Sequence, residues 1–406
     1  MFPETFVKTK FKEFYSNNKT LVPFKLDERE FGVGAFGKKI VSRHLAFQSE
    51  NDFNYFLSNS APLFISHSLA YYSFPSRTPM KDKGFKGADL AFEFDVDDLQ
   101  TDCKKEHDSW KCGKCGATGK GLIKNCPNCG FGVLTDEWFC SKCLEIVKQQ
   151  TFRLIDFLTS DFGFSIKDLS INYSGAKGLH VWLSGNTIKD FSHSARIELI
   201  DYLTANNLDL QQQGFVLTKQ VSSVPKLSDS KGWSKKILSE LKNYLFKVNY
   251  IELAAITGVS VKTTKRLLEN RDFLLTSIDR GVLIDVSVTR NLDFWNNLFD
   301  FIVSKTKIEI DRQTSTDIRK ILRVPETLHG GTGLKAAVVK DLNAFNALTD
   351  TIVFSEQPVK LKLKKTPRFE LNENFYGPFK ENEIVSLPEN VAVFLSARGN
   401  AVDVNL

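Results

Sequence analysis

The chain has 406 residues, 42% of them hydrophobic, so it is long enough to bury a sizeable core in one large domain or in two or three smaller ones. Its net charge of +6 is mildly basic, which fits a polyanionic partner such as nucleic acid without requiring one. No run of 18 apolar residues occurs and the first residues are charged from Glu4 onward, which argues against a membrane-spanning or secreted protein and predicts a soluble, intracellular one.

The first hundred residues are expected to build a helix and then a sheet. Residues 4–18 place apolar side chains at helical spacing among lysines, which predicts an amphipathic helix. From 28 to 98, short apolar runs alternate with Gly, Pro and Ser, which predicts strands joined by turns, with one helix near 52–58. The last run, FEFDVDD at 92–98, has the alternation of a half-buried strand and predicts that Asp95 and Asp97 lie side by side on one face.

The two carboxylates of this run have two interpretations. Neighbouring carboxylates repel each other unless a cation or solvent compensates them. Mg²⁺ takes carboxylate oxygens as ligands, and a pair of such ions usually needs a third carboxylate from elsewhere in the fold. A strand that runs out into a solvated acidic turn accounts for the same residues equally well. The run alone leaves both interpretations open.

The cysteines form a compact module. All seven lie between 103 and 143, and six of them form three Cys-x-x-Cys pairs, a spacing typical of metal ligands and of a protein in a reducing compartment. A redox function is disfavoured because no thioredoxin-like context surrounds the pairs. With one histidine they offer eight ligands, enough for two four-coordinate Zn²⁺ ions. The eight are Cys103, His107, Cys112, Cys115, Cys126, Cys129, Cys140 and Cys143.

The eight ligands can be grouped in two ways. In the nested grouping the inner pairs form a ribbon, with ligands Cys112, Cys115, Cys126 and Cys129. The others then close a site beneath it, with ligands Cys103, His107, Cys140 and Cys143. In the alternative, the first four and the last four ligands each hold one ion, which the near-duplication of DSWKC and DEWFC keeps open. We favour the nested grouping, because the last pair leads into a long predicted helix that would anchor a structural site.

In the remainder of the chain, segments with a strand pattern alternate with segments with a helical pattern. LSINYSGAKGLHVWLSG, 169–185, predicts two strands around a glycine-containing turn, after a helix that stops at Gly163. Residues 192 to about 278 are mostly helical and predict an inserted subdomain. Strand-like text returns at 281–289 and 334–340 with a helix between, and PENVAVFLSARG near the end predicts a helix or a strand. The lysine-rich run at 360–365 is most simply a solvated strand edge.

Three segments together resemble the catalytic small subunit of the archaeal and eukaryotic type of DNA primase. They are KGADLAFEFDVDD, SGAKGLHVWLSG and IDRQTSTDIRKILRVPETLHGGTGL. The resemblance extends from REFG at 29–32 to VAVFLSARG at 391–399, so it covers nearly the whole chain. It implies an α/β protein with a mixed-sheet primase catalytic (prim) fold flanked by helices, a zinc-binding module and an inserted helical subdomain.

The resemblance also implies a division of the chain. The catalytic domain would begin with 1–100, continue over 146–190 and be completed by 281–406. The zinc-binding module would take 101–145, with the inner four-cysteine ribbon as an addition to the family's usual single zinc site. The helical subdomain would take 191–280.

Site residues follow from the resemblance one at a time. Asp95 and Asp97 match the family's metal-binding Asp-x-Asp, and Asp311 matches its third catalytic carboxylate, so the three would hold two Mg²⁺ or Mn²⁺ ions. Considered alone, Asp311 is equally a helix cap, with Asp317 as its competitor for the metal. The nucleotide-binding residues that the resemblance implies are Arg29, Asp52, Ser174, Lys177, His180, Arg323 and His329.

The nucleotide-binding set has simpler interpretations from the residues alone. His180, between apolar neighbours, is more often a core histidine, and His329 lies in turn-forming text where a structural role is natural. Arg323 is by default a surface charge. The family often carries arginine where this chain has Ala176 and Lys177.

The resemblance implies DNA-directed primer synthesis, a DNA-directed RNA polymerase activity. The enzyme would transfer nucleotides from NTPs or dNTPs on a single-stranded DNA template, as the catalytic subunit of a heterodimer whose large subunit carries an iron–sulfur domain. It would act at the nucleoid in the cytoplasm of an archaeal cell. Two alternatives are a primer-extending repair polymerase of the same superfamily and a non-catalytic nucleic-acid-binding protein that uses the zinc ribbon.

Overall fold

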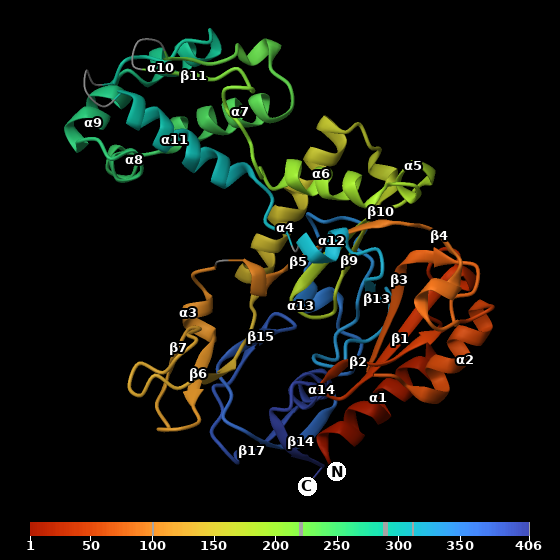
Figure 1. Ribbon diagram of the computed structural model, residues 1–406. Helices are drawn as coiled ribbons and strands as arrows, with labels where there is room; N and C mark the ends of the chain where they lie inside the picture. The colour runs from red at the N-terminus through yellow and green to blue at the C-terminus, as the bar shows by residue number, and fades with distance from the viewer. Residues whose placement is uncertain (100, 219–221, 287–290, 311, 406) are drawn as a thin grey trace. The chain divides into compact units, whose positions relative to one another are not determined.

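The computed structural model describes residues 1–99, 101–218, 222–286, 291–310 and 312–405 (Figure 1). The chain forms two compact units. Unit 1 comprises Met1–Thr151, Lys167–Arg196 and Ile310–Leu406. Unit 2 comprises Phe152–Ile166 and Ile197–Glu309. The α/β class predicted from the sequence is confirmed, because unit 1 holds most of the described sheets and their covering helices, and unit 2 is mainly helical with one small sheet of β11 (Val216–Leu217) and β12 (Ser222–Ser223).

Two sheets form the centre of unit 1. The first has the strand order β13-β3-β1-β2, with β4 paired to β3. Its strands are β1 (Arg29–Ala35), β2 (Lys38–Leu45), β3 (Phe64–Tyr72), β4 (Phe85–Ala88) and β13 (Ile321–Arg323). The second has the order β5-β10-β9, with strands β5 (Leu90–Asp95), β9 (Leu169–Tyr173) and β10 (Gly178–Leu183). The described strand pairs of both sheets are antiparallel, whereas the sequence led us to expect mixed sheets.

The two sheets share a buried contact. Leu69 and Leu322 of the first sheet pack against Ala91 and Trp182 of the second, and all four side chains are almost inaccessible to solvent. Burial of aliphatic and aromatic side chains is the main favourable term in folding. This contact therefore holds β13 near the strand β5 that carries the acidic run.

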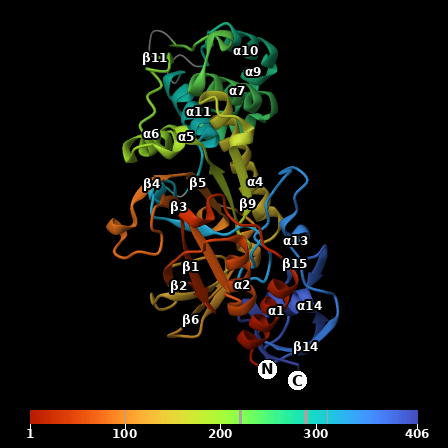
Figure 2. The same ribbon diagram turned by 90° about the vertical axis from the view of Figure 1, so that its right-hand side faces the viewer.

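Helices cover unit 1. The N-terminal helix α1 (Pro3–Asn17) confirms the helix predicted over 4–18, and α2 (Glu50–Ser60) the one near 52–58. The segment near the end of the chain is a helix, α14 (Glu389–Ala397), whose residues after Glu389 are all buried, and which contacts α1. The two ends of the chain lie together, because the Met1 ammonium is 2.9 Å from an Asp403 carboxylate oxygen (Figure 2).

The lysine-rich run forms a central strand, so the expected strand edge is wrong. β14 (Pro358–Leu363) lies between β17 (Ile384–Pro388) and β18 (Ala401–Val404). Leu361 and Leu363 are fully buried on one face, which leaves the lysines on the other while neighbours on both sides pair the backbone. The adjacent hairpin joins β15 (Phe369–Leu371) to β16 (Asn374–Tyr376). Residues 334–340, predicted as a strand, make only isolated bridges.

Unit 2 is built mainly from helices. They are the end of α6 (His193–Leu203), α7 (Gly232–Lys247), α8 (Tyr250–Thr257), α9 (Val261–Glu269), α10 (Arg271–Asp279) and α11 (Asn291–Thr306). α11 packs on α7 and α8, so the unit extends beyond the 191–280 expected for the helical subdomain. Residues 281–286 form no strand, and 287–290 lie outside the described residues. None of the described helices is both long and apolar enough to cross a membrane.

Candidate functional site

The acidic run lies at the end of β5. The strand ends at Asp95, and a short 3₁₀ turn over Val96–Asp98 follows. The Asp97 amide donates to the Asp95 carboxylate at 2.9 Å, which caps the turn and bends the chain away from the strand direction. The strand predicted over 92–98 is therefore too long, and Asp97 does not share a strand face with Asp95. The cap nevertheless keeps the two residues adjacent.

Negative charge exceeds positive charge in this acidic group. Burial raises the pKa of Asp95 above its usual value, and although the Asp97 amide and Lys177 oppose this, the charges of Asp97 and Glu93 add to the rise. Lys177 Nζ lies 2.8 Å from Asp97 and 3.1 Å from Glu137, so one ammonium serves two carboxylates. A bound divalent cation would lower the pKa of Asp95. The oxygen donors fit Mg²⁺ or Mn²⁺.

The turn between β9 and β10 lies against the end of β5. Gly178 is paired with Asp95, and a Cβ atom at this position would lie 2.4 Å from the Phe94 carbonyl oxygen, so only glycine fits here. The Ser174 hydroxyl accepts the amides of Ala176 and Gly178 at 3.3 and 3.1 Å. The hairpin predicted over 169–185 is thus confirmed, and its turn is held rigidly beside Asp95.

His180 lies on β10 opposite Glu93. Its side chain is 3% exposed, and its Nε2 atom lies 3.5 Å from the Glu93 carboxylate. Its Nδ1 atom is buried and makes no hydrogen bond with the described residues. Such an unsatisfied buried polar atom is unfavourable unless a ligand or water pairs with it.

His329 belongs to a loop that is attached to the β9–β10 turn. The Thr332 hydroxyl donates to the Gly175 carbonyl oxygen, and a Cβ at Gly175, whose φ is +85°, would lie 2.5 Å from His329 Cβ. Burial and the nearby Arg323 charge hold the pKa of His329 well below its usual value. Its Nδ1 accepts the Gly331 amide at 3.2 Å, so the neutral ring carries its proton on Nε2.

Arg323 ends β13 and is buried, which corrects the default view of it as a surface charge. It is 8% exposed and lies 4.7 Å from the Phe64 ring. Its Nη1 donates to the Ile65 carbonyl oxygen at 3.4 Å, while its Nε is buried and makes no hydrogen bond with the described residues. Burial lowers the pKa of Arg323 to about 10, so it is still a cation at neutral pH. A buried guanidinium with unused donors is suited to a phosphate.

These side chains line one cavity of about 220 Å³ in unit 1. Its polar lining residues are Lys39, Ser66, Glu93, Asp95, Ser174, His180, Lys320, Arg323 and His329. Lys39, Ser66, Glu93 and Lys320 were not predicted as site residues. Glu93 and Lys320 could have been noticed because they lie inside the first and third primase-like segments, whereas Lys39 and Ser66 face the cavity only because of sheet pairing. The lining combines carboxylates with cationic and neutral hydrogen-bond donors, as a metal–triphosphate complex requires.

Four of the described sequence-predicted residues do not line this cavity: Asp97 and Lys177, which form an ion pair at 2.8 Å, and Arg29 and Asp52. Arg29 is buried in an ion pair with Asp89 at 2.5 Å and donates to the Ser68 and Leu69 carbonyl oxygens. Asp52 lies in the first turn of α2, where its carboxylate accepts the Gln48 amide at 3.1 Å. Both residues have structural contacts here, and their assignment as nucleotide ligands stays a prediction.

The third carboxylate, Asp311, lies outside the described residues. The helix α12 (Arg312–Thr316) begins directly after it and packs against β5. Its competitor Asp317 is exposed and accepts the Arg319 amide at 2.8 Å, as a turn-forming aspartate does. The packing of α12 brings this part of the chain to the strand of Asp95.

The structure brings the eight cysteine-module ligands together in the nested grouping. The outer group is Cys103, His107, Cys140 and Cys143. The inner group is Cys112, Cys115, Cys126 and Cys129. Within each group all ligand atoms lie within 4.8 Å of one another, and no cysteine forms a disulfide. Tetrahedral zinc with Zn–S bonds of about 2.3 Å has sulfurs about 3.8 Å apart, which both groups approach.

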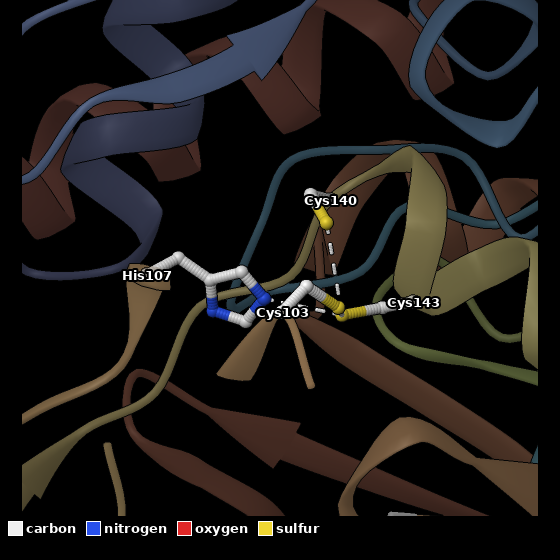
Figure 3. A group of neighbouring side chains, drawn as sticks. All are labelled: Cys103, His107, Cys140 and Cys143. Atoms are coloured by element: carbon white, nitrogen blue, oxygen red, sulfur yellow. Dashed lines mark hydrogen bonds between the residues drawn. The ribbon is translucent and has the colours of Figure 1, made fainter. Parts of the chain in front are cut away.

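Figure 3 shows the outer group, whose four side chains converge. Cys143 Sγ lies 3.2 Å from Cys103 Sγ and 3.1 Å from His107 Nε2. Cys143 is in the first turns of α4 (Ser141–Asp156), and Cys103 precedes the short helix α3 (Lys104–His107). The group therefore connects the two ends of the module.

The inner group lies within a small sheet of order β7-β6-β8. Its strands are β6 (Ser109–Cys112), β7 (Thr118–Lys120) and β8 (Val133–Asp136). The amide of Cys115, together with that of Lys114, lowers the pKa of Cys112 to about 6. Zinc binds the thiolate form, so these amides favour a metal ligand.

Asp108 orients His107 and provides the first testable prediction. Its carboxylate, 1% exposed, lies 2.7 Å from His107 Nδ1 and accepts the Trp138 amide at 2.8 Å. Carboxylates that orient a ligating histidine typically contribute 10–100-fold to metal affinity. We expect Asp108→Asn to weaken zinc binding by about this factor, measured by competition with a chelator. Asp102→Asn, at an exposed position, is the matched control; equal affinities in both variants would refute the orienting role.

A larger cavity, about 680 Å³, lies in unit 2. Its lining includes Lys231, Lys235 and Lys236, and Lys236 lies 3.5 Å from Asp161. It contains none of the residues predicted from the sequence. We place the candidate active site at the smaller cavity of unit 1, because the carboxylates of Glu93 and Asp95 line it together with His180 and Arg323, which each have a buried nitrogen that makes no hydrogen bond with the described residues.

Comparisons with known proteins identify relatives of this chain. A family model described as DNA primase small subunit matches residues 134–341, about half of the chain. A protein named DNA primase small subunit PriS from Methanococcoides burtonii is 29% identical over 417 residues, covering 98% of this chain and 97% of that protein. A protein of the same name from Archaeoglobus fulgidus is 27% identical, and the alignment covers 99% of each chain.

Proposed function

The chain belongs to the DNA primase small subunit family, and from that premise we propose that it catalyses primer synthesis on single-stranded DNA. The proposed reaction is nucleotidyl transfer from NTPs or dNTPs to a growing primer 3′-hydroxyl during replication. One observation carries the proposal: the acidic end of β5 and the buried, incompletely bonded Arg323 line the same cavity. Phosphoryl transfer needs these two features together, because the enzyme mainly positions reactants and neutralises charge.

The proposed roles follow from the contacts. Asp95, Asp97 and Asp311 hold two Mg²⁺ or Mn²⁺ ions, which when bound activate the primer hydroxyl and stabilise the leaving pyrophosphate. Arg323 directs its unused N–H donors at the triphosphate, and the neutral His329 offers its Nε2 proton to a phosphate oxygen.

Other residues of the cavity have positioning roles in this proposal. Ser174 fixes the turn that keeps Asp95 in place. His180, with its unpaired Nδ1, faces the same cavity from β10. Lys177, outside the cavity lining, is paired with Asp97 and Glu137; if a metal took the Asp97 carboxylate, Lys177 would keep Glu137 and gain a donor for a phosphate oxygen.

The proposal includes two Zn²⁺ ions, one in each cysteine group, because both groups have tetrahedral donor sets. It also includes a large-subunit partner, since the relatives are named small subunits. A cytoplasmic location beside archaeal nucleoid DNA stays a prediction that the relatives favour.

The decisive experiment compares unprimed with primed single-stranded template. A primase starts new chains on unprimed template in the presence of Mg²⁺ or Mn²⁺, whereas a repair polymerase only extends an existing primer. Template binding without metal-dependent incorporation would identify a non-catalytic binding protein and refute the proposal. The assay includes the large subunit where that partner co-purifies.

The nucleotide-binding role of Arg323 is tested by Arg323→Gln. Because the guanidinium is buried and lines the cavity, its loss should raise KM for the nucleotide about tenfold or more, with a smaller rise in Arg323→Lys. Steady-state kinetics of primer extension measure both. Arg77→Gln removes an exposed arginine outside the cavity and should leave KM unchanged. An unchanged KM in Arg323→Gln would contradict the assignment.

A further inference from the structure

The inner zinc ribbon, residues 109–135, has charged side chains of one sign only. It contains four lysines and no aspartate or glutamate. The four, Lys111, Lys114, Lys120 and Lys124, are all exposed. A Zn²⁺ ion with four thiolates carries a charge of about −2, so the ribbon would keep a net charge of about +2 in the metal-bound protein. Apart from the thiolates, every charged side chain that residues 109–135 expose to solvent is therefore a cation.

Strand register places two of these lysines on one face. Lys111 of β6 is paired with Thr118 of β7 and with Leu134 of β8, and Ser109 is paired with Lys120. Directly paired residues project to the same face of a sheet, and residues two apart on a strand share that face. Lys111, Lys120 and Leu134 thus lie together, and we call this surface the lysine face.

The opposite face of the small sheet forms the core of the ribbon. Trp110 and Cys112 pack there with Cys126. A Cβ at Gly119 would lie 2.6 Å from the Trp110 ring, so the indole covers that glycine. Asp136, which shares the lysine face at its edge, lies 3.9 Å from Arg398 and is thereby partly neutralised. On the lysine face itself, the exposed Lys120 donates to the Glu106 carbonyl oxygen at 2.9 Å.

Two apolar side chains of the ribbon are also exposed, and one of them, Leu134, shares the lysine face. Leu134 is 71% exposed and Phe131 is 55% exposed, although Trp110, in the same ribbon, is buried. Phe131 lies in the turn directly after Cys129 and Gly130, so the zinc site would hold its backbone. Phe131 is thus an exposed aromatic ring in the same small ribbon as four exposed lysines, and proteins bind single strands by combining stacking on a base with ion pairs to phosphates.

We propose that the lysine face binds the phosphate backbone of single-stranded nucleic acid, with Phe131 stacked on a base. Identifying that strand with the template rests on the proposed function; the binding itself does not. Charge complementarity favours a polyanion, and the exposed aromatic ring favours a nucleic acid over an acidic polypeptide. The outer zinc group and the packing of Trp138 against Phe369 and Phe394 attach the ribbon to unit 1, so binding here would hold the strand on the catalytic unit.

The test uses the full chain with two zinc ions and a fluorescently labelled single-stranded oligonucleotide, followed by anisotropy as a function of salt. Lys111→Glu combined with Lys120→Glu should weaken binding at least tenfold and reduce the salt slope by about 1.4, because single strands release about 0.7 counterion per phosphate contact. Phe131→Ala should weaken binding about tenfold with no change of slope. The zinc content of each variant shows that the ribbon is folded.

The matched control is Lys8→Glu with Lys12→Glu, which makes the same charge change at exposed positions of α1. Equal weakening in this control, or unchanged binding in the ribbon variants, would overturn the inference. So would competition by polyglutamate as strong as by unlabelled oligonucleotide. Primer extension distinguishes failure of this inference from failure of the proposed function. If the inference is correct, the ribbon variants should have a higher KM for template and an unchanged kcat. If it is wrong, incorporation that depends on Asp95 is still expected.

Discussion

Asp95→Asn should abolish nucleotide incorporation and leave the metal-free protein at least as stable as the wild type. The activity is lost because an amide is a poor ligand for a divalent ion at the position where charge must be neutralised; we expect a fall of at least about 10³-fold in kcat, roughly 4 kcal/mol in the barrier. The Asn side-chain oxygen can still accept the Asp97 amide, so the turn after β5 is kept.

The stability of this variant follows from the sign of the pKa shift. Burial, with Asp97 and Glu93 adding to it, raises the pKa of Asp95 above its unfolded value, so the folded state favours the protonated carboxyl. The resulting stabilisation is present below the unfolded pKa and is lost as pH rises through the folded pKa. At neutral pH the wild type therefore carries an unfavourable charge that the asparagine removes. Thermal unfolding in EDTA at pH 7 should show an unchanged or higher Tm.

Two further variants make the result specific. Asp97→Asn should also lose activity, but it removes an ion pair whose carboxylate is 46% exposed, so its effect on stability should stay within about 1 kcal/mol. Asp98→Asn alters the neighbouring exposed carboxylate and should remain active. Wild-type incorporation by Asp95→Asn or by Asp97→Asn would remove the basis of the metal assignment.

The second large effect separates the two zinc groups. Cys143→Ser and Cys126→Ser should each reduce the zinc content from two ions per chain to one, measured by elemental analysis. Only Cys143→Ser should lower the Tm of the whole protein, by about 10 °C or more, because structural zinc contributes many kcal/mol to the part of the fold that it joins. Cys126→Ser should unfold the ribbon alone.

The difference comes from the surroundings of the two groups. Cys143 is fully buried at the start of α4, and the preceding Trp138 and Phe139 are buried beside Phe394 of α14. In the inner group Cys115 and Cys129 are exposed. Loss of the outer ion therefore disturbs the core of unit 1. Equal Tm values for the two variants, or a zinc content of one in the wild type, would contradict this account.

Local sequence was sufficient to predict the elements in which apolar residues or glycines recur every few positions. The helix α1 and the β9–β10 hairpin were predicted because apolar spacing and glycine chemistry act within a few residues. The nested grouping of cysteines was favoured because one pair leads directly into α4. By contrast, the strand at 92–98 was predicted too long, because the capping of Asp97 by Asp95 gives no apolar signal.

The sequence by itself determined the chemistry of this protein: the acidic pair, the eight zinc-type ligands and the primase-like segments are properties of residue type and spacing. Only the tertiary structure decided which of them meet. Arg323 is buried against Phe64 and lines the cavity with Asp95. Arg29, also a cation, instead forms an ion pair with Asp89. The reason is physical: whether a charge is available for a ligand depends on the partners that packing brings to it from distant parts of the chain, and local sequence does not contain that information.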